Sequence, residues 1–214
     1  MRKIDIAVVD YGMGNLRSVS KALEHVAPSK NVLVTSNPDD IANAHRVVFP
    51  GQGAMPDCIR ELDLRGLRDA VLDAAENKPF LGICIGMQML FDHSEEGDAA
   101  GLALLKGNVK RFAAADMKDS SGAKLKVPHM GWNQVYQAKS HDLWQDIADG
   151  ERFYYVHSYY VQPDDDSLTS GYSEYPNPFT SAIAINNLFA VQFHPEKSAN
   201  AGLQMLSNFV RWQP

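Results

Sequence analysis

The chain has 214 residues, 45% of them hydrophobic, and a formal net charge of −6, which is enough apolar material for one domain over residues 1–214. Its acidic balance and the absence of any Lys/Arg run longer than two residues argue against a nucleic-acid partner. No apolar stretch approaches the roughly 18 residues of a membrane span, and the N-terminus does not resemble a signal peptide, so we expect no membrane contact and a cytoplasmic protein.

The first half of the chain alternates short apolar runs with amphipathic segments. Strands are predicted at Ile4–Val9, Asn31–Thr35, Arg46–Phe49 and Pro79–Ile83. Helices are predicted at Leu16–Val26, Met55–Leu64, Leu67–Glu76 and Gly86–Phe91. This alternation favours an α/β fold in which helices flank an open, mostly parallel central sheet.

The second half is rich in strand patterns. They occur at Val109–Phe112, Gln134–Tyr136, Phe153–Tyr160, Leu168–Tyr172, Ala182–Asn186 and Phe189–Phe193. Asn186-Asn187 is typical of a hairpin turn, and a final helix is predicted at Gly202–Trp212. This half therefore predicts an added antiparallel region, and no linker separates it from the first half.

One of the two cysteines lies in a pattern typical of a nucleophile. Gly82-Ile83-Cys84-Ile85-Gly86 follows a predicted strand and precedes a predicted helix, as in the nucleophile elbow, where flanking glycines permit a sharp turn. Unpaired N–H groups at the start of a helix favour a thiolate. Taken alone, the pattern leaves open that Cys84 is a small buried hydrophobe. Cys58 has no paired glycines and is interpreted as structural.

A histidine and a carboxylate near the C-terminus form a candidate base and its orienting partner. In the extended segment Phe193-His194-Pro195-Glu196, residues i and i+2 point to the same side, so Glu196 can hold the imidazole in one tautomer. His157 is the alternative base, but no acidic residue is near it in sequence. The sequence has no His-Glu-x-x-His motif or cysteine cluster that would make His194 a metal ligand, so no metal is expected.

Cleavage of an amide by a thiolate needs N–H donors for the tetrahedral oxyanion. The backbone N–H of Ile85 is one candidate, and the loop Pro50-Gly51-Gln52-Gly53 is a second source. From the residues alone an ordinary strand-to-helix turn is the preferred interpretation of that loop. Gln88 follows Cys84 by one helical turn, so its amide can face a substrate above the elbow.

These motifs together resemble the class I (triad) glutamine amidotransferases. The resemblance rests on Pro-Gly-x-Gly at 50–53, on Gly-x-Cys-x-Gly-x-Gln at 82–88, and on Phe-His-Pro-Glu at 193–196. It implies a flavodoxin-like fold, a Cys84–His194–Glu196 triad that forms a glutamyl thioester from L-glutamine, and no cofactor. It also implies oxyanion N–H groups on Gln52 and Ile85 and a glutamine pocket along Gln88, Ser158 and Tyr159.

Further segments are similar to one branch of that family, the glutaminase subunits of imidazole glycerol phosphate synthases of histidine biosynthesis. They are Asp10–Ser18, Pro128–Asn133, Tyr155–Tyr159 and His194–Ser198. This likeness implies that ammonia passes to a (β/α)8-barrel cyclase subunit in a heterodimer. It also implies that Trp132, Tyr154 and Lys197 face that partner.

Two alternatives stay open at this point. The first is the glutaminase subunit of another amidotransferase, which would serve anthranilate, guanylate or carbamoyl phosphate synthesis. The second is a nucleotide- or flavin-binding module without catalytic activity, because Gly12-x-Gly14 follows the first strand. A dinucleotide fingerprint, however, needs a third glycine where Arg17 stands and an acid where Thr35 stands.

Overall fold

Strands from the first half of the chain, joined by one late strand, form the parallel part of the sheet. The computed structural model describes residues 3–113, 117–118 and 122–214. Five neighbouring strands lie in the order β2-β1-β3-β4-β13, and every adjacent pair is parallel. Their bounds are Ile6–Val9 (β1), Val32–Thr35 (β2), Arg46–Gly51 (β3), Phe80–Cys84 (β4) and Leu188–Val191 (β13). β1, β4 and β13 are buried along their whole length, as expected where helices cover both faces.

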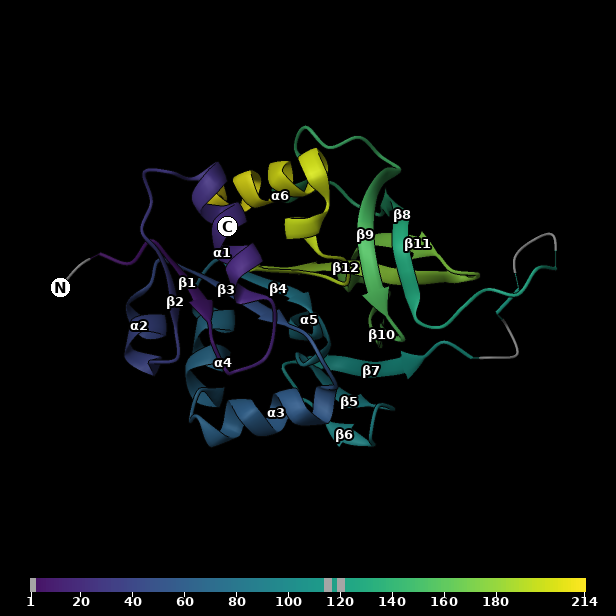
Figure 1. Cartoon of the computed structure of the whole chain (residues 1–214), viewed down its shortest axis with the longest axis horizontal. Coiled ribbons are helices and arrows are strands. Elements are labelled where there is room, and N and C mark those ends of the chain that lie inside the picture. The colour runs from purple at the N-terminus through teal and green to yellow at the C-terminus, as the bar shows by residue number, and fades with distance from the viewer. Residues whose placement is uncertain (1–2, 114–116, 119–121) are drawn as a thin grey trace.

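Helices cover both faces of this parallel sheet. Figure 1 shows α1 and α6 above the sheet and α2, α3 and α4 below it. Their bounds are Leu16–Val26 (α1), Pro38–Asn43 (α2), Met55–Leu64 (α3), Arg68–Asn77 (α4) and Ala199–Arg211 (α6). Each helix turns an apolar stripe toward the sheet, such as Val19 and Leu23 on α1, and this burial stabilises the layered structure.

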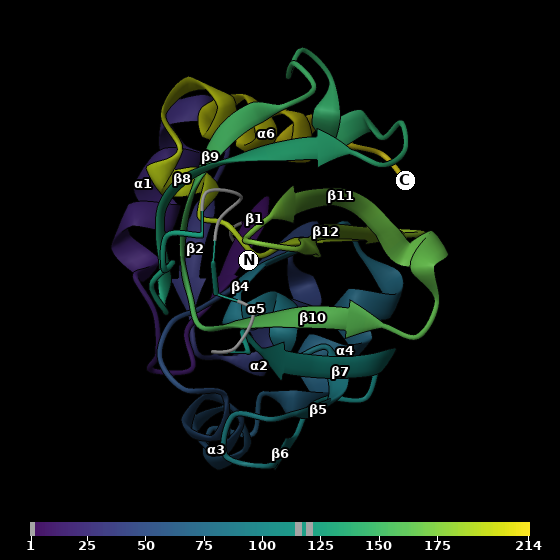
Figure 2. The same cartoon turned by 90° about the vertical axis from the view of Figure 1, so that its right-hand side faces the viewer.

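The second half of the chain extends the same sheet with mainly antiparallel strands. From β13 the order continues β12-β10-β7-β5-β6, and β11, β8 and β9 branch off from β12. In Figure 2, β8 and β9 lie together, set apart from β10 and β7. The bounds are Phe91–Ser94 (β5), Ala99–Ala100 (β6), Leu105–Arg111 (β7), His129–Gln137 (β8), Glu151–His157 (β9), Tyr159–Pro163 (β10), Thr169–Glu174 (β11) and Pro178–Ile185 (β12). Short 3₁₀ turns lie at Asp142–Trp144 (η1), Asp166–Leu168 (η2) and Pro195–Lys197 (η3).

The mixed α/β architecture predicted from the sequence is therefore confirmed. The helices predicted at Leu16–Val26 and Met55–Leu64 have those bounds. The hairpin at Asn186-Asn187 is also confirmed, because Ile185 pairs with Leu188 across it. Asn186 has a φ of 49°, a conformation that Asn tolerates better than most residues.

The helix predicted at Gly86–Phe91 is wrong in extent. The helix that follows Cys84, α5, spans only Ile85–Gln88, and Phe91 begins strand β5, where it pairs with Leu105 of β7. The apolar run after the elbow fits a helix and a buried strand equally well. Pairing with a strand from later in the chain decides the outcome.

Two further differences concern the strand at Phe153–Tyr160 and the helix α2. The predicted strand is two strands, because β9 ends at His157, the chain bends at Ser158, and β10 begins at Tyr159. No helix was predicted at Pro38–Asn43, although its start carries a cap: the Asn37 side chain accepts a hydrogen bond from the N–H of Asp39 at 3.0 Å.

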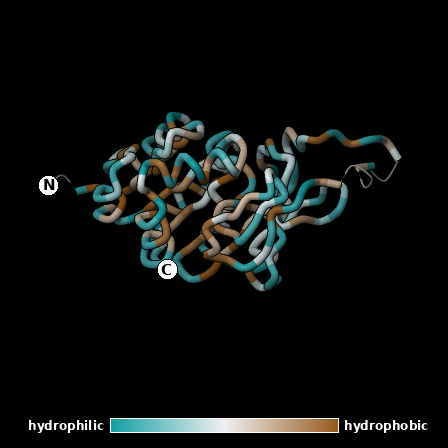
Figure 3. Tube along the Cα trace, turned by 90° about the horizontal axis from the view of Figure 1, so that it is seen from below, coloured by the Kyte–Doolittle hydropathy of each residue, from teal (hydrophilic) through white to brown (hydrophobic). Residues whose placement is uncertain are grey.

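Figure 3 shows the most hydrophobic parts of the trace running through the middle of the molecule. One large cluster of buried apolar side chains extends from the parallel strands to Phe153 and Phe193 near β9 and β13. Within residues 3–113, 117–118 and 122–214, no helix is long and apolar enough to cross a membrane.

Candidate active site

Cys84 lies on a strained turn at the carboxyl end of β4. Its φ of 56° and ψ of −112° fall outside the regions that L-residues favour, at a cost of about 1–3 kcal/mol. A Cβ on Gly86 would overlap the carbonyl oxygen of Phe49, and a Cβ on Gly82 would lie 2.9 Å from the Cβ of Ala190. The flanking glycines therefore let the backbone turn sharply in a closely packed place, as the elbow pattern predicts.

The structure brings His194 and Glu196 together. The ring Nδ1 of His194 lies 2.9 Å from Oε1 of Glu196, and the two side chains are only 4% and 1% exposed. The backbone N–H of His194 donates to the carbonyl of Tyr154 on β9 at 2.9 Å. The other ring nitrogen, Nε2, is buried without a hydrogen-bond partner. The imidazole is thus held from one side, and its second nitrogen is left for other chemistry.

The environment of His194 stabilises its charged form. Burial alone would lower the pKa of His194, but the charge of Cys84, and after it Glu196, outweigh burial and raise the pKa to about 10. Cys84 and His194 therefore interact, although they come from distant parts of the sequence. A thiolate beside an imidazolium is the arrangement that activates a cysteine nucleophile.

Cys84 and His194 share a cavity of about 260 Å³. Its size lies near the lower end for small-molecule sites and suits a ligand no larger than an amino acid. The residues that line it come from several distant segments: Gln52, Gly53, Cys84, Ile85, Gln88, Glu96, Pro128, Val156, His157, Ser158, Tyr159 and His194. The predicted glutamine-pocket residues thus lie together around the thiol.

The side chain of Gln88 has a fixed orientation in this cavity. Its Nε2 donates to the carbonyl of Tyr159 at 3.1 Å and to Oε1 of Gln192 at 3.0 Å. Both acceptors require the nitrogen end of the amide, so the oxygen Oε1 is buried and without a partner. Gln192, which the sequence did not point to, also donates to the sulfur of Cys84 at 3.7 Å.

The predicted oxyanion loop lies beside the elbow. Gly51 ends β3 and pairs in register with Cys84, while Gln52 and Gly53 line the cavity. The carbonyl of Gln52 accepts a hydrogen bond from the thiol of Cys58 at 3.8 Å. Cys58 is fully buried, and burial raises its pKa to about 11. Cys58 is therefore a neutral thiol under the loop, in line with its structural interpretation.

The Gly12-x-Gly14 segment packs against this loop. A Cβ on Gly14 would lie 3.7 Å from the Cα of Gly51 and 3.8 Å from the backbone nitrogen of Gln52. Gly14 thus lies beside the loop next to Cys84, whereas a Cβ on Gly12 would meet the side chain of Arg65, so protein groups surround both glycines.

His157, the alternative base, has both ring nitrogens engaged. Nδ1 lies 2.8 Å from the carbonyl of Tyr159, and Nε2 lies 2.8 Å from Nδ1 of His129. Burial, and after it His129, lower the pKa of His157 to about 3. A histidine held neutral by two hydrogen bonds has no free nitrogen to take a proton from a thiol, so the geometry favours His194.

Sequence reasoning missed Glu96. This residue lines the cavity, and its Oε2 accepts a hydrogen bond from the N–H of Met55 at the start of α3, at 2.7 Å. Nothing in its polar surroundings in the sequence singles it out. The β5–β6 hairpin carries it to the cavity, and that hairpin falls partly where a helix was predicted.

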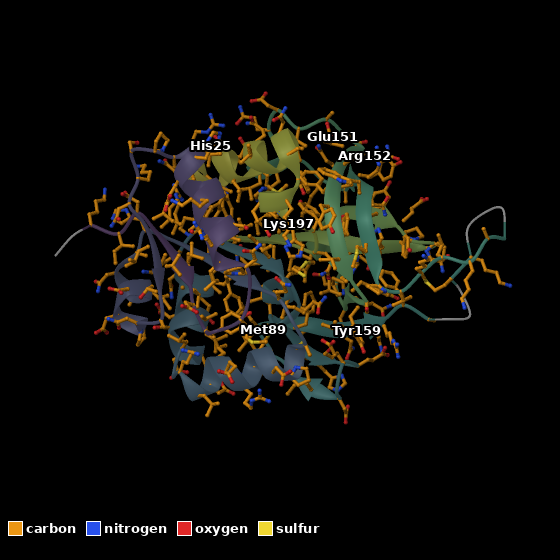
Figure 4. All side chains as sticks on the ribbon, viewed as in Figure 1. His25, Met89, Glu151, Arg152, Tyr159 and Lys197 are labelled. Carbon is orange, nitrogen blue, oxygen red and sulfur yellow. The ribbon has the colours of Figure 1, made fainter. Side chains whose placement is uncertain are left out.

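The three residues predicted to face a partner also lie together. The rings of Trp132 and Tyr154 meet edge to face at 6.2 Å, and Nζ of Lys197 lies 6.0 Å from the centre of the Tyr154 ring. Trp132 is 46% exposed, and its neighbour Met130 on β8 is 62% exposed. Figure 4 shows Lys197 beside β9. Tyr154 and Lys197 are partly buried. The group of Met130, Trp132, Tyr154 and Lys197 is called the β8–β9 surface below.

Comparison with known proteins gives a consistent result. The sequence model of the family described as glutamine amidotransferase class-I matches residues 7–212. The chain is 68% identical to the imidazole glycerol phosphate synthase subunit HisH of Thiobacillus denitrificans, over 99% of this chain and 92% of the relative. It is 67% identical to the subunit of that name from Nitrosospira multiformis, over 98% of this chain and 99% of the relative.

Solved structures support the fold. A glutamine amidotransferase structure superposes with a TM-score of 0.70 at 13% identity, over 96% of this chain and 99% of that one. A glutamine amidotransferase from Thermotoga maritima superposes with a TM-score of 0.61 at 16% identity, over 94% of this chain and 80% of that one.

Proposed function

The chain belongs to the class-I glutamine amidotransferase family, and from this premise we propose that it is the glutaminase subunit of an imidazole glycerol phosphate synthase. It hydrolyses L-glutamine and supplies ammonia for histidine biosynthesis in the cytoplasm. One observation carries the catalytic part: Cys84 on its strained turn shares a small cavity with a His194 that Glu196 holds at Nδ1. The names of the relatives at 68% and 67% identity favour this synthase over anthranilate, guanylate or carbamoyl phosphate synthesis.

The first half of the reaction forms a thioester. The sulfur of Cys84 attacks the side-chain carbonyl carbon of glutamine, and the carbonyl oxygen becomes an oxyanion that the N–H groups of Ile85 and Gln52 stabilise. The imidazolium of His194 then donates its Nε2 proton to the amide nitrogen. The C–N bond breaks, ammonia leaves, and a glutamyl thioester remains on Cys84.

The second half releases glutamate. Neutral His194 takes a proton from a water molecule through Nε2, and the hydroxide attacks the thioester carbonyl. The C–S bond breaks, which regenerates the thiolate of Cys84 beside the imidazolium. Throughout, Glu196 keeps Nδ1 protonated and the ring in one orientation.

The cavity offers complementary groups for the remainder of glutamine. The unpartnered Oε1 of Gln88 accepts a hydrogen bond from an N–H group of the substrate. The Glu96 carboxylate, which lines the same cavity, pairs with the α-ammonium group. Backbone groups of Ser158 and Tyr159, on the bend between β9 and β10, complete the wall.

A second subunit consumes the ammonia. We propose that it is a (β/α)8-barrel cyclase and that the β8–β9 surface contacts it. Surface aromatic side chains and cations are typical of protein interfaces. Here an exposed Trp132 lies against the partly buried Tyr154, with Lys197 close to the Tyr154 ring. We further propose that residues 1–214 act as one domain, because the single sheet joins strands from both halves.

Turnover with two nitrogen sources tests this function. In a complex with the cyclase subunit, Cys84→Ala should reduce glutamine-dependent turnover by at least about 10³-fold, because the nucleophile is lost. Turnover with ammonium salts should persist. Cys58→Ala is the matched control and should retain both activities. If Cys84→Ala retains glutamine-dependent turnover, the catalytic assignment is wrong.

A further inference from the structure

Two buried histidines form a pair at the cavity, which one of them, His157, lines. His129 on β8 and His157 at the end of β9 are partners in the antiparallel register, and they are only 4% and 6% exposed. The distance from Nδ1 of His129 to Nε2 of His157 is 2.8 Å. The His129 ring stacks between Tyr155 at 4.8 Å and Tyr175 at 3.9 Å. The glutaminase reaction described above uses neither imidazole.

The hydrogen-bond partners fix the tautomer of each ring. The carbonyl of Tyr159 can only accept, so Nδ1 of His157, 2.8 Å away, carries the hydrogen and Nε2 accepts. Nδ1 of His129 must therefore donate to that Nε2. Nε2 of His129 is then an acceptor, and the Asn133 amide lies 3.4 Å from it as the donor. All the hydrogen bonds point in one direction, from Asn133 toward Tyr159.

The neutral state of the pair is consistent with its surroundings. Burial lowers the pKa of His129 to about 4, and burial followed by His129 lowers that of His157 to about 3. Protonation of His157 at Nε2 would set two N–H groups against each other across 2.8 Å. The pair thus stays neutral at physiological pH and keeps its direction.

This chain of hydrogen bonds ends at the group that orients Gln88. The carbonyl of Tyr159 accepts from Nδ1 of His157 and also from Nε2 of Gln88. The bond from His157 to Tyr159 spans the bend at Ser158, where β9 gives way to β10. It therefore holds both the backbone of the cavity wall and the acceptor that engages Nε2 of Gln88, which leaves Oε1 as the unpartnered end of that amide.

We propose that His129 and His157 are positioning residues for glutamine: as a neutral, one-directional pair they fix the Tyr159 carbonyl and, through it, the Gln88 amide. This inference rests on the proposed glutaminase function. Neither histidine transfers a proton in the reaction. Loss of the pair should weaken binding of glutamine more than it slows the chemical steps.

Two substitutions of similar shape separate positioning from packing. His157→Asn places an N–H group where Nδ1 stood, whereas His157→Leu fills similar space without a donor. In the complex with the cyclase subunit, His157→Leu should raise KM for L-glutamine by about tenfold, the value of one hydrogen bond. The kcat should stay within about threefold, and His157→Asn should restore KM to near the wild-type value. Equal KM values for the two variants, whether raised or not, would overturn the proposal.

A measurement on the wild-type chain covers the case in which His157→Leu does not fold. Side-chain ¹⁵N NMR should show His129 and His157 as neutral rings protonated at Nδ1. A ring of His157 protonated at Nε2 at neutral pH contradicts the proposal. If the wild-type complex does not hydrolyse glutamine, the proposed function fails, whereas wild-type turnover with an unchanged KM in His157→Leu refutes only the positioning role.

Discussion

Two histidines from different parts of the chain line the same small cavity, and their states are opposite. His194 follows β13 and is held by a carboxylate, and the charge of Cys84 helps to raise its pKa to about 10. His157 ends β9 and is held by a second imidazole and a carbonyl, and its pKa falls to about 3. Both rings are almost fully buried.

The comparison shows that burial alone does not decide the role of a histidine. Burial opposes the charge on both rings, and the partners decide whether that opposition is overcome. Interactions with Cys84 and Glu196 stabilise the cation at His194, and Nε2 has no hydrogen-bond partner and can exchange a proton. A neighbouring donor and a carbonyl at His157 use both nitrogens, which gives rigidity in place of reactivity.

The largest expected effect comes from removing the negative charge of Glu196 next to His194. Glu196→Gln keeps a side chain of the same shape but loses the carboxylate, so the cation loses support and the tautomer is no longer fixed. We expect kcat for glutamine-dependent turnover to fall by about 10²-fold or more. Ammonia-dependent turnover of the complex should not change. A glutamine-dependent kcat close to wild type would show that Glu196 does not support the base.

The dependence of stability on pH should show the two histidine environments separately. In the unfolded chain each histidine titrates near pH 6.5. His129 and His157 stay neutral in the folded chain down to about pH 4 and 3. The free energy of unfolding should therefore fall as the pH drops below about 6.5, by up to about 1.4 kcal/mol per pH unit for each ring.

His194 has the opposite effect, because its folded pKa is raised to about 10. Its stabilising contribution is complete below about pH 6.5 and is lost as the pH rises toward 10. Chemical denaturation across this pH range measures how the free energy of unfolding falls toward acid pH, the acid limb, and toward alkaline pH, the alkaline limb. His157→Asn should flatten the acid limb, and Cys84→Ala should flatten the alkaline limb. If each variant alters both limbs equally, the two environments are not independent.

The smallest expected effect comes from giving the His129 ring a carboxylate neighbour like the one beside His194. The amide of Asn133 lies 3.4 Å from Nε2 of His129, so Asn133→Asp places a carboxylate beside this imidazole, as Glu196 stands beside His194. The pKa of His129 should rise by at least about one unit, measured by NMR titration. Asn133→Ala is the control and should leave the pKa low. A low pKa in Asn133→Asp would mean that burial outweighs a single adjacent carboxylate here.

Much of the site could be predicted from short-range pattern. The glycines around Cys84 are needed by the backbone of one tight turn, and the two-residue spacing of His194 and Glu196 puts both side chains on one side of an extended segment. Such constraints act between residues that are close in the sequence, so they can be recognised from the sequence alone. The helices at 16–26 and 55–64 were predictable for the same reason, since a helix forms its hydrogen bonds locally.

The tertiary structure alone decided which distant groups meet. Strand β5 begins at Phe91, and Glu96 reaches the cavity, because β7 provides the backbone partner for that segment. Gln192 faces the thiol, and His129 meets His157, because strands far apart in the chain pair in one register. The sequence determined the tight turn at Cys84, the pairing of His194 with Glu196 and the layered fold. The state of each buried histidine depended on partners that only the folded sheet brings within hydrogen-bond distance.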